Sequence, residues 1–397
     1  MKVLQVHCTY QYLGGEDSVV ASERALLQEA GVIVEELNFS NVGSAMKKVV
    51  QAPFNIGSYR LTKKKIREFK PDIIHIHNLH FAASSSVIYA IKKSGVPYVQ
   101  TLHNFRMICP SGVMFHNGKL FLDSMHQKFP WSAVKAGVYR NSKVLTGWLA
   151  LSVKLHQWMG TWQQASKYIV LTDHAKRIFL ESGIGLKAAQ IAIKPNFSTS
   201  KYIPSTNNSG SFVFIGRLSE EKGISVLLKA FASLPHKLLI AGDGPMKADV
   251  LTYARKYANI EYVGKLSRDE VFPFLAAGAA LIFPSTWYEG MPITIIEAFA
   301  SGLPVIASKI GAMEEMIVPG YNGLHFETGQ TEDLKNKVNE FHALSQDQQE
   351  TFRKNAYSSY LQHYTPEKNI ELLLRIYNDV IAQTPSPTQV KTAYATV

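Results

Sequence analysis

The sequence predicts an α/β protein of two doubly wound domains, and three observations support this prediction. Short β-branched runs alternate with longer amphipathic segments, as in KVLQVH (2–7) followed by SVVASERALLQEAG (18–31). Strands that alternate with helices favour parallel sheets with helices on both faces. The length of 397 residues exceeds one typical core. The third observation is the stretch FSTSKYIPSTNNSGS (197–211), which lacks periodicity and is typical of an interdomain linker.

The predicted elements follow the same rhythm in both halves. In the first half we expect a helix near 84–94 and strands in KVLQVH (2–7), VIVEEL (32–37), PDIIHIHN (71–78), PYVQTLHN (97–104), YIVL (168–171) and IAIKPN (191–196). In the second half we expect helices ending near 233 and starting at 292, with strands in FVFIGR (212–217), HKLLIAGDG (236–244), IEYVG (260–264), AALIFPS (279–285) and PVIAS (304–308). We place the domains at 1–200 and 206–365, and expect a disordered tail from about 384 to 397.

Charge and cysteine content limit the possible functions. Residues 1–205 hold 25 Lys and Arg against 11 Asp and Glu, whereas the remaining residues hold 17 against 20. The basic first half predicts an anionic partner, such as a nucleic acid, a phosphorylated acceptor or an anionic membrane surface. Two cysteines, Cys8 and Cys109, can form neither a disulfide framework nor a four-cysteine zinc site. Without a signal-peptide pattern or a run of 18 apolar residues, we expect a cytoplasmic location.

Residues 104–165 interrupt the alternation and form a long insertion. Its later part has helical spacing, with the apolar residues Trp148, Leu149, Leu151, Leu155, Trp158 and Met159 among cations. One interpretation is a helix packed on the sheet or in the cleft. The other is a peripheral face that lies against a membrane, which the basic runs at 61–70, 47–48 and 92–93 could extend.

Glycine-containing turns after strands predict phosphate contacts, because free backbone N–H groups and helix N-termini gather there. The candidates are YLGGEDS (12–18), IGRLSEEKGI (215–224) and AGDGP (241–245), but no GxGxxG or Walker pattern occurs. In TWYEGMPITIIEAF (286–299), we expect Pro292 to be the first helical residue. Glu289 would then lie in the preceding loop and Glu297 in the second turn.

The order and spacing of these motifs resemble the retaining glycosyltransferases of the family-four type, which have the GT-B fold. The matching segments are GRLSEEKG, AGDGP, VGKLSRDEV, FPSTWYEGMPITIIEAFASGLPVIAS and GAMEEMIVPGYNGLHF, with YLGGEDSVV, PDIIHIHN and TLHNFRMICP in the first half. The resemblance implies two Rossmann-like domains facing a central cleft. It also implies that a last helix, about 366–383, crosses back to the N-terminal domain. Relatives often carry cysteines in the region corresponding to 121–138, and this chain has none there.

The resemblance implies a role for each matching residue. Glu289 would accept hydrogen bonds from sugar hydroxyls, and Glu297 would bind the nucleotide ribose. Arg217 and Lys222 would balance the departing diphosphate, and His103 would face the donor sugar. Gly14 and Gly15 would close over the phosphates. The remaining donor contacts would come from Gly216, Gly242, Gly264, Lys265, Leu266, Gly290, Met291, Pro292 and Ile293.

The implied activity is transfer of a sugar, with retention, from a nucleotide donor such as a UDP- or GDP-sugar to a glycan or lipid-linked acceptor in polysaccharide or glycoconjugate biosynthesis. Fixed cations at the leaving group make a metal or other cofactor unnecessary. A metal on His75, His77 and His80 is a weaker interpretation than packing or acceptor contact. Three alternatives remain: a sugar-nucleotide epimerase, a phosphorylase and a non-catalytic glycan-binding partner. A nucleic-acid binder has no supporting motif.

Overall fold

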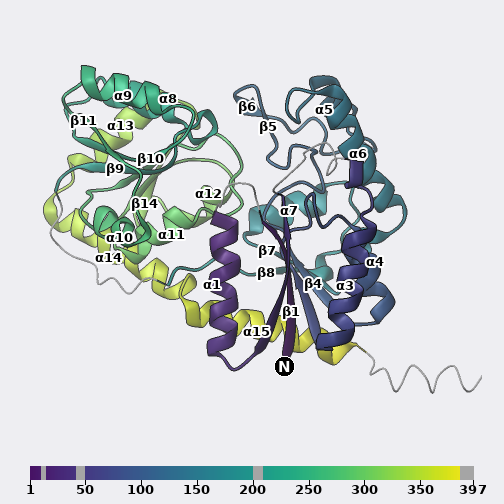
Figure 1. Ribbon diagram of the computed structural model, residues 1–397. Coiled ribbons are helices and arrows are strands. Elements are labelled where there is room, and N and C mark those ends of the chain that lie inside the picture. Colours follow the sequence, from purple (N-terminus) through teal and green to yellow (C-terminus); the bar gives the residue numbers. More distant parts are fainter. Residues whose placement is uncertain (10–14, 42–49, 200–208, 385–397) are drawn as a thin grey trace, which may run out of the picture. The chain divides into compact units, whose positions relative to one another are not determined.

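The computed structural model describes residues 1–9, 15–41, 50–199 and 209–384, and the chain divides into two compact units (Figure 1). Unit 1 contains residues 1–112 and 122–194 together with the chain from Asn369 onward. Unit 2 contains residues 113–121 and 195–368. The short segment 113–121, which lies inside the predicted insertion, therefore groups with the second unit rather than with its neighbours in sequence.

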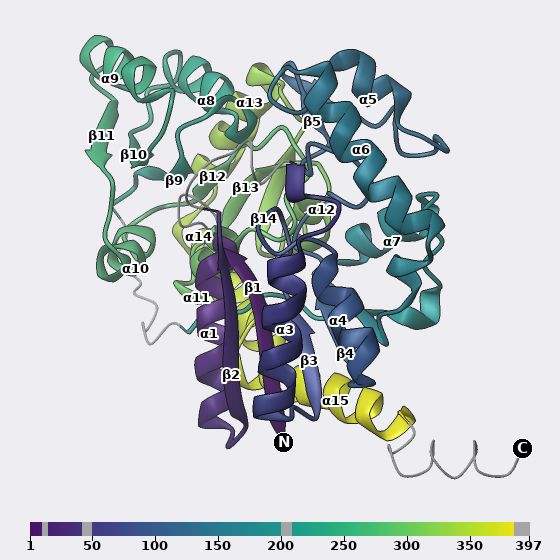
Figure 2. The same cartoon turned by 45° about the vertical axis from the view of Figure 1, so that its right-hand side comes forward.

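Unit 1 is built on a parallel six-stranded sheet with the order β2-β1-β3-β4-β7-β8. The strands are β1 (Lys2–Thr9), β2 (Ile33–Ser40), β3 (Ile73–Ile76), β4 (Tyr98–Thr101), β7 (Lys167–Val170) and β8 (Ile191–Ile193). Its helices include α1 (Gly15–Glu29), α3 (Ile56–Phe69), α4 (Ser86–Ser94), α5 (Trp131–Ala136), α6 (Lys143–Trp158), α7 (Asp173–Glu181) and α15 (Pro366–Gln383). The sheet stands between α1 on one face and α3 and α4 on the other (Figures 1 and 2). Both faces are covered, as a parallel sheet requires.

The C-terminal helix α15 belongs to the core of unit 1. Its residues Leu373, Tyr377 and Val380 are buried in one apolar cluster with Leu27 of α1 and Val3 of β1. Because these side chains lie inside the cluster, α15 covers the same face of the sheet as α1. The last helix of the chain therefore completes the fold of the first unit.

Unit 2 repeats the design with a second parallel sheet, in the order β11-β10-β9-β12-β13-β14. The strands are β9 (Phe212–Arg217), β10 (Leu238–Asp243), β11 (Ile260–Gly264), β12 (Leu281–Phe283), β13 (Val305–Ser308) and β14 (Gly323–Phe326). The helices are α8 (Ile224–Phe231), α9 (Lys247–Lys256), α10 (Arg268–Ala276), α11 (Ile293–Ala300), α12 (Ala312–Met316), α13 (Thr331–His342) and α14 (Gln346–His363). A two-stranded hairpin, β5 (Phe115–His116) and β6 (Lys119–Leu120), also belongs to this unit. The two sheets confirm the predicted doubly wound α/β class.

The strand orders fix where a ligand can bind. In an open parallel sheet, a crevice forms at the carboxyl ends of the two strands between which the strand order reverses. In unit 1 these strands are β1 and β3, and in unit 2 they are β9 and β12. The loops that leave β9 and β12 carry the two motifs with the predicted cations and carboxylates, so the topology brings these motifs together.

One predicted boundary is wrong. Pro292 is not the first helical residue, since it has an extended ψ of 116° and forms the N-cap of α11, which begins at Ile293. A proline tolerates both positions, because it needs no hydrogen bond to its own nitrogen at either. Glu297 still lies in the second turn of this helix and Glu289 in the loop before it.

Candidate functional site

The centre of the site in unit 2 is an ion pair between the two signature loops. Lys222 Nζ lies 2.6 Å from Glu289 Oε1, and the hydroxyl of Ser285 donates to the same oxygen at 2.7 Å. The Lys222 ammonium also lies 5.7 Å from the ring centre of Phe283 and 5.5 Å from that of Trp287. Glu289 is buried. A buried carboxylate needs such partners, and both contacts engage Oε1.

Backbone contacts hold the two loops against each other. The carbonyl oxygen of Glu221 accepts a hydrogen bond from the Thr286 N–H at 2.9 Å and lies 3.2 Å from the Ser285 hydroxyl oxygen. Gly223 has a φ of +72°, and a Cβ there would lie 1.9 Å from the carbonyl oxygen of Pro284. Only glycine allows this approach. The glycine that ends GRLSEEKG therefore sets the position of Lys222 relative to Glu289.

The AGDGP turn has a similar structural explanation. Added Cβ atoms would lie 1.9 Å from the Gly216 carbonyl oxygen at Gly242 and 2.5 Å from the Leu218 carbonyl oxygen at Gly244, and both glycines have positive φ. These glycines let the end of β10 pack against the end of β9. Gly216 and Gly242, predicted as donor contacts, therefore lie side by side at the carboxyl edge of the sheet.

Glu297, in the second turn of α11, has a different environment from this ion pair. Burial raises the pKa of its carboxyl group to about 7, and the Arg268 guanidinium opposes part of this rise. Arg268 is the first residue of α10 and follows the predicted VGKLS contact. The sequence analysis missed Arg268. The signal for it was present, because it lies in the matching segment VGKLSRDEV, two residues after the predicted donor contact Leu266.

The other predicted donor residues lie at the carboxyl edge of the same sheet or in the loops that leave it. Arg217 ends β9, is exposed, and pairs in register with Asp243 of β10. Gly264 ends β11 with a φ of +90° and is followed by Lys265 and Leu266, of which Lys265 is exposed. The remaining residues form the turn into α11: Gly290, Met291, Pro292 and Ile293. Within this turn, Met291 is buried, and its sulfur and carbonyl oxygen accept hydrogen bonds from Asn196.

In unit 1, His103 follows β4 and is half-buried beside a buried histidine. Its Nε2 lies 3.2 Å from His77 Nδ1, and the two rings stack. Burial, and then the His77 imidazole, hold the pKa of His103 well below its usual value. At neutral pH the His103 ring is therefore uncharged. Gly14 lies outside the described residues, and Gly15 is the first residue of α1.

His77 belongs to a buried polar network that the sequence analysis missed. Glu23 Oε1 lies 3.2 Å from both His75 Nδ1 and His77 Nε2, and its other oxygen accepts from Lys194 Nζ at 2.8 Å. Burial alone would raise the pKa of Glu23, but the Lys194 ammonium and the two imidazoles hold it well below its usual value. The signal for Glu23 was its place between Val19 and Leu27, on the apolar face of α1.

The same network bears on the predicted histidine cluster. Glu23, His75 and His77 bring ligand atoms within 4.8 Å of one another, a spacing that suits a metal ion. His80 is not part of this group. The hydroxyl of Tyr377 lies 2.6 Å from His75 Nδ1, and the Lys194 ammonium already supplies a positive charge at Glu23. The network therefore has the composition of a structural polar core, with α15 contributing Tyr377.

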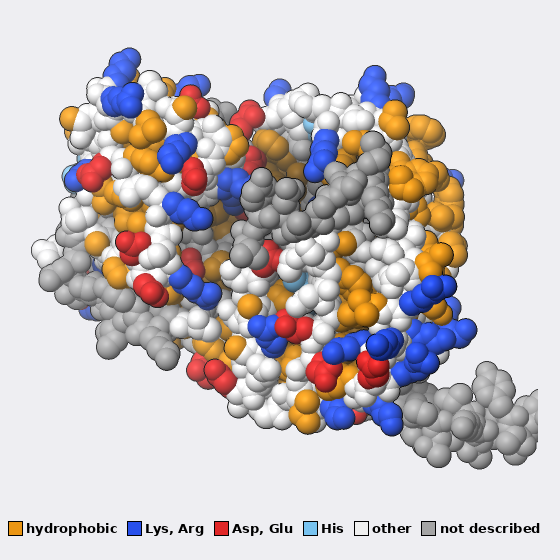
Figure 3. All heavy atoms as spheres, in the orientation of Figure 1, with side chains coloured by type: hydrophobic (Ala, Val, Ile, Leu, Met, Phe, Trp, Pro, Cys, Tyr) orange, Lys and Arg blue, Asp and Glu red, His pale blue; other side chains and the backbone are white. Residues whose placement is uncertain are grey.

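Helix α6 presents an unusual surface. Its exposed apolar residues are spaced at 3 and 4 positions along one face: Val144, Trp148, Leu151, Leu155 and Trp158. Exposed Trp131 of α5 and Met159 lie nearby in the sequence. Figure 3 shows hydrophobic side chains along the edge of unit 1 over α5 and α6, with Lys and Arg side chains gathered over α3 and α4. We call the five α6 residues the apolar stripe. Lys47 and Lys48, predicted to extend the basic surface, lie outside the described residues.

The sequence left two interpretations of this helix: one packed on the sheet or in the cleft, and one with a face that lies against a membrane. The exposure of the apolar stripe disagrees with a helix whose apolar residues all pack inward. Only Leu149 of the predicted set is buried. In the part of the chain that the structure describes, no helix has both the length and the hydropathy needed to cross a bilayer.

Comparisons with known proteins agree with this architecture. Residues 201–359 match the family model of glycosyl transferases group 1, and residues 19–197 match that of Glycosyltransferase Family 4. An uncharacterized glycosyltransferase of Methanocaldococcus jannaschii is 24% identical over 85% of this chain and 87% of its own length. The putative teichuronic acid biosynthesis glycosyltransferase TuaC of Bacillus subtilis is 30% identical over 68% of this chain and 61% of its own length.

Solved structures share the fold across nearly the whole chain. Sucrose-phosphate synthase from Thermosynechococcus elongatus superposes with a TM-score of 0.72 at 17% identity, covering 96% of this chain and 99% of its own. The Anabaena protein HepE in complex with UDP superposes with a TM-score of 0.64 at 18% identity, covering 95% of this chain and 100% of its own. Two matching family models, two doubly wound sheets and these neighbours together lead to one conclusion: the chain belongs to the GT-B glycosyltransferases of the family-four type.

Proposed function

We propose that this glycosyltransferase moves a sugar, with retention of configuration, from a nucleoside-diphosphate sugar to a glycan or lipid-linked acceptor. The observation that carries the proposal is the Lys222–Glu289 ion pair at the β9/β12 switch point. It places a cation and a carboxylate together at the crevice where doubly wound sheets bind ligands. The cation would bind the diphosphate, and the carboxylate would accept hydrogen bonds from the sugar hydroxyls.

The chemistry assigns a task to each group. The bond from the anomeric carbon to the diphosphate oxygen breaks, and its electron pair leaves with the diphosphate. The acceptor oxygen attacks on the same face, and its proton passes to the departing phosphate oxygen. Lys222 and Arg217 stabilise the charge that develops on the leaving group, so we expect no metal to be required. Glu289 orients the sugar hydroxyls, and no side chain forms a covalent intermediate.

The proposed donor contacts divide between the two carboxyl groups. Glu289, which is paired with Lys222, would accept hydrogen bonds from the sugar hydroxyls. Glu297, whose pKa lies near 7, can donate or accept a hydrogen bond at neutral pH and suits the ribose hydroxyls. HepE has been crystallised with UDP and with UDP-glucose, which supports a nucleotide sugar as donor without fixing the base for this chain.

The acceptor side of the proposal concerns unit 1. We infer that the apolar stripe of α6 lies in the interfacial layer of a membrane, because an exposed apolar helix face beside cations fits an anionic lipid surface. The cations are those of α3 and α4, among them exposed Lys64, Arg67, Lys92 and Lys93. Names among the relatives, such as teichuronic acid biosynthesis and a lipopolysaccharide N-acetylglucosaminetransferase of Salmonella typhimurium, support an acceptor in surface-polysaccharide synthesis. The protein would then act peripherally on the cytoplasmic face.

A thermal-shift panel tests the donor class. The purified protein is melted with UDP, GDP, ADP and their glucose, galactose, mannose and N-acetylglucosamine conjugates. A ligand present at one hundred times its Kd stabilises the folded state by about 2.7 kcal/mol, so one nucleotide should raise Tm by several degrees while the others leave it unchanged. If no nucleotide or nucleotide sugar raises Tm, the proposed donor class is wrong.

A further inference from the structure

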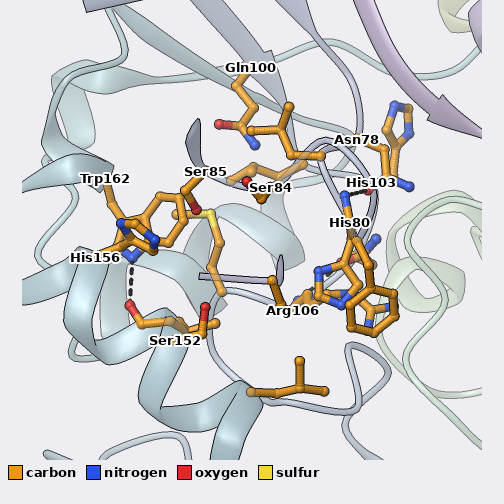
Figure 4. A pocket seen from close by; sticks show the side chains of 18 of the residues that line it. Asn78, His80, Ser84, Ser85, Gln100, His103, Arg106, Ser152, His156 and Trp162 are labelled. Atoms are coloured by element: carbon orange, nitrogen blue, oxygen red, sulfur yellow. Dashed lines mark hydrogen bonds between the residues drawn. The ribbon is translucent and has the colours of Figure 1, made fainter. Parts of the chain in front are cut away.

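Unit 1 has a pocket at the carboxyl ends of β3 and β4, and the function above does not explain its charge. It is lined by residues 77–81, 84 and 85 after β3, by residues 100–104, 106 and 107 at the end of β4 and beyond it, and by the inner face of α6. All of its lining residues belong to unit 1. Figure 4 shows Arg106, His80 and His103 at one end and His156 and Trp162 at the other.

The polar end of the pocket is cationic and has unused donors. The lining residues include Arg106 but no Asp or Glu. Among the described residues, Arg106 Nε and Nη1 have no hydrogen-bond partner although both atoms are buried, and the same is true of His80 Nε2. A buried donor without a partner costs roughly 1–3 kcal/mol, and more when it is charged. Both side chains line the pocket, so a ligand bound there can supply the partners that these three atoms lack.

Arg106 is held in place rather than free to swing. Its backbone N–H donates to Asn104 Oδ1 at 3.1 Å, and its guanidinium carbon lies 5.8 Å from the ring centre of Phe81. Gly112 has a φ of +79°, and a Cβ there would lie 3.0 Å from both Cζ and Nη2 of Arg106. The absence of a side chain at Gly112 therefore makes the space that the guanidinium fills. A guanidinium fixed in this way is preorganised for a two-oxygen anion.

We propose that this pocket binds the acceptor through an anionic group, a phosphate or a carboxylate, held by the Arg106 guanidinium and the His80 imidazole. Naming the ligand as the acceptor rests on the proposed function, while the anion site rests on Arg106 and His80 alone. His103 lines the same pocket, so an anion at Arg106 places the acceptor beside the residue predicted to face the donor sugar.

The apolar part of the lining restricts the rest of the ligand. It is formed by Leu149 and Val153 of α6 together with Trp162, and we call it the apolar wall. Leu149 and Val153 project from the inner face of α6, and the outer face of this helix carries the apolar stripe. Two sources of anion fit the pocket: the phosphate of a lipid-linked acceptor, whose chain would follow the apolar wall, and the carboxylate of an acidic sugar.

Titration calorimetry with five probes tests the site: inorganic phosphate, farnesyl phosphate and glucuronate, with farnesol and glucose as uncharged counterparts. The titrations are run on the wild type and on Lys222→Gln, Arg106→Gln, Arg106→Lys and Lys92→Gln. Lys222→Gln removes the cation of the donor site, which could itself bind phosphate. Lys92 is an exposed cation of α4 outside the pocket and serves as the matched control.

We expect at least one anion to bind more tightly than its uncharged counterpart. Arg106→Gln should weaken this binding by about tenfold to a hundredfold, because a hydrogen-bonded charge contact contributes about 1.5–3 kcal/mol. The affinity of Arg106→Lys should lie between those of the wild type and Arg106→Gln, and Lys92→Gln should change little. Any anion binding that Lys222→Gln removes belongs to the donor site and not to this pocket. Tighter binding of farnesyl phosphate identifies a lipid phosphate, and tighter binding of glucuronate identifies an acidic sugar.

Two results would overturn the inference: no anion binding above that of the uncharged probes, or anion binding that Arg106→Gln leaves unchanged. Circular dichroism and Tm show whether Arg106→Gln is folded, and if it is not, His80→Asn and Arg106→Lys provide the same comparison. The nucleotide panel fails or succeeds independently of this result, because the anion titration requires no donor.

Discussion

Lys222 Nζ and Glu289 Oε1 lie 2.6 Å apart although 67 residues separate them in the chain. The pair joins the loop after β9 to the loop after β12, and Ser285 donates to the same carboxylate oxygen. The two residues that the family resemblance assigns to the diphosphate and to the sugar thus interact with each other before any donor binds. Under the proposed function, a bound donor would meet a cation and a carboxylate that are already in contact.

The first prediction concerns the energy of this pair. Lys222→Met leaves the buried Glu289 charge without its partner and should lower the free energy of unfolding by about 3 kcal/mol. In a double-mutant cycle with Glu289→Gln, urea unfolding should give a coupling energy of about 1–3 kcal/mol. The exposed pair Lys237–Glu261, at 2.9 Å, is the matched control, and its coupling should stay below about 1 kcal/mol. Equal coupling in the two cycles would contradict a special role for the Lys222 pair.

The second prediction uses the pKa of Glu297. Since burial raises this pKa from 4.5 to about 7, the folded state binds a proton more tightly than the unfolded state. The contribution of protonated Glu297 to the free energy of unfolding is therefore complete below pH 4.5, and it is lost as the pH rises through 7. Glu297→Gln cannot ionise, so its stability relative to wild type should increase between pH 5 and pH 8 by roughly 2 kcal/mol. Urea unfolding at both pH values measures the difference, and a constant difference would show that Glu297 ionises normally.

The third prediction separates the roles of two glycines with similar backbone angles. Gly223 has a φ of +72°, and a Cβ added there would lie 1.9 Å from the Pro284 carbonyl oxygen. Gly264 has a φ of +90°, and a Cβ added there would have no atom within 4 Å. Gly223→Ala should lower the free energy of unfolding by about 3 kcal/mol or more, through backbone strain and overpacking. Gly264→Ala should cost only about 1–2 kcal/mol. Equal costs would mean that the Gly223–Pro284 approach does not restrict position 223.

The fourth prediction concerns the apolar stripe. The double variant Trp148→Ser and Trp158→Ser should bind vesicles of phosphatidylglycerol and phosphatidylcholine at least about tenfold more weakly, since each large apolar side chain contributes more than 1 kcal/mol when buried. Sedimentation with vesicles measures the loss. Leu180→Ser and Val318→Ser, which remove exposed apolar residues elsewhere, are the controls. If the Trp variant sediments as wild type does, the stripe is not a membrane surface.

Much of the fold could be predicted because it depends on local pattern. Alternating strands and helices, with glycines at the strand ends, determine a doubly wound sheet, and the spacing of TWYEGMPITIIEAF already placed Glu289 in a loop and Glu297 in a helix. The family motifs identified Lys222 and Glu289 as candidate site residues in the same way, because each motif is a short continuous segment.

The interactions that join distant segments could not be predicted. Glu23 meets Lys194 across 171 residues, and His75 meets Tyr377 across 302, so no local spacing encodes them. The buried guanidinium of Arg106 is another example, since the sequence places it in a loop where most arginines are solvated. The missing side chain at Gly112 leaves room for the guanidinium of Arg106, which lines the pocket.

The most direct test of the central claim is the release of nucleoside diphosphate, followed by phosphorus-31 NMR, from the donor that the thermal-shift panel selects. With a matching glycan or lipid-linked acceptor, and with EDTA present, we expect the wild type to release diphosphate and to form a product with the anomeric configuration of the donor. Glu289→Gln should be slower by about two to three orders of magnitude while binding the nucleotide almost as well. Equal rates in the two proteins, or an inverted product, would contradict the account.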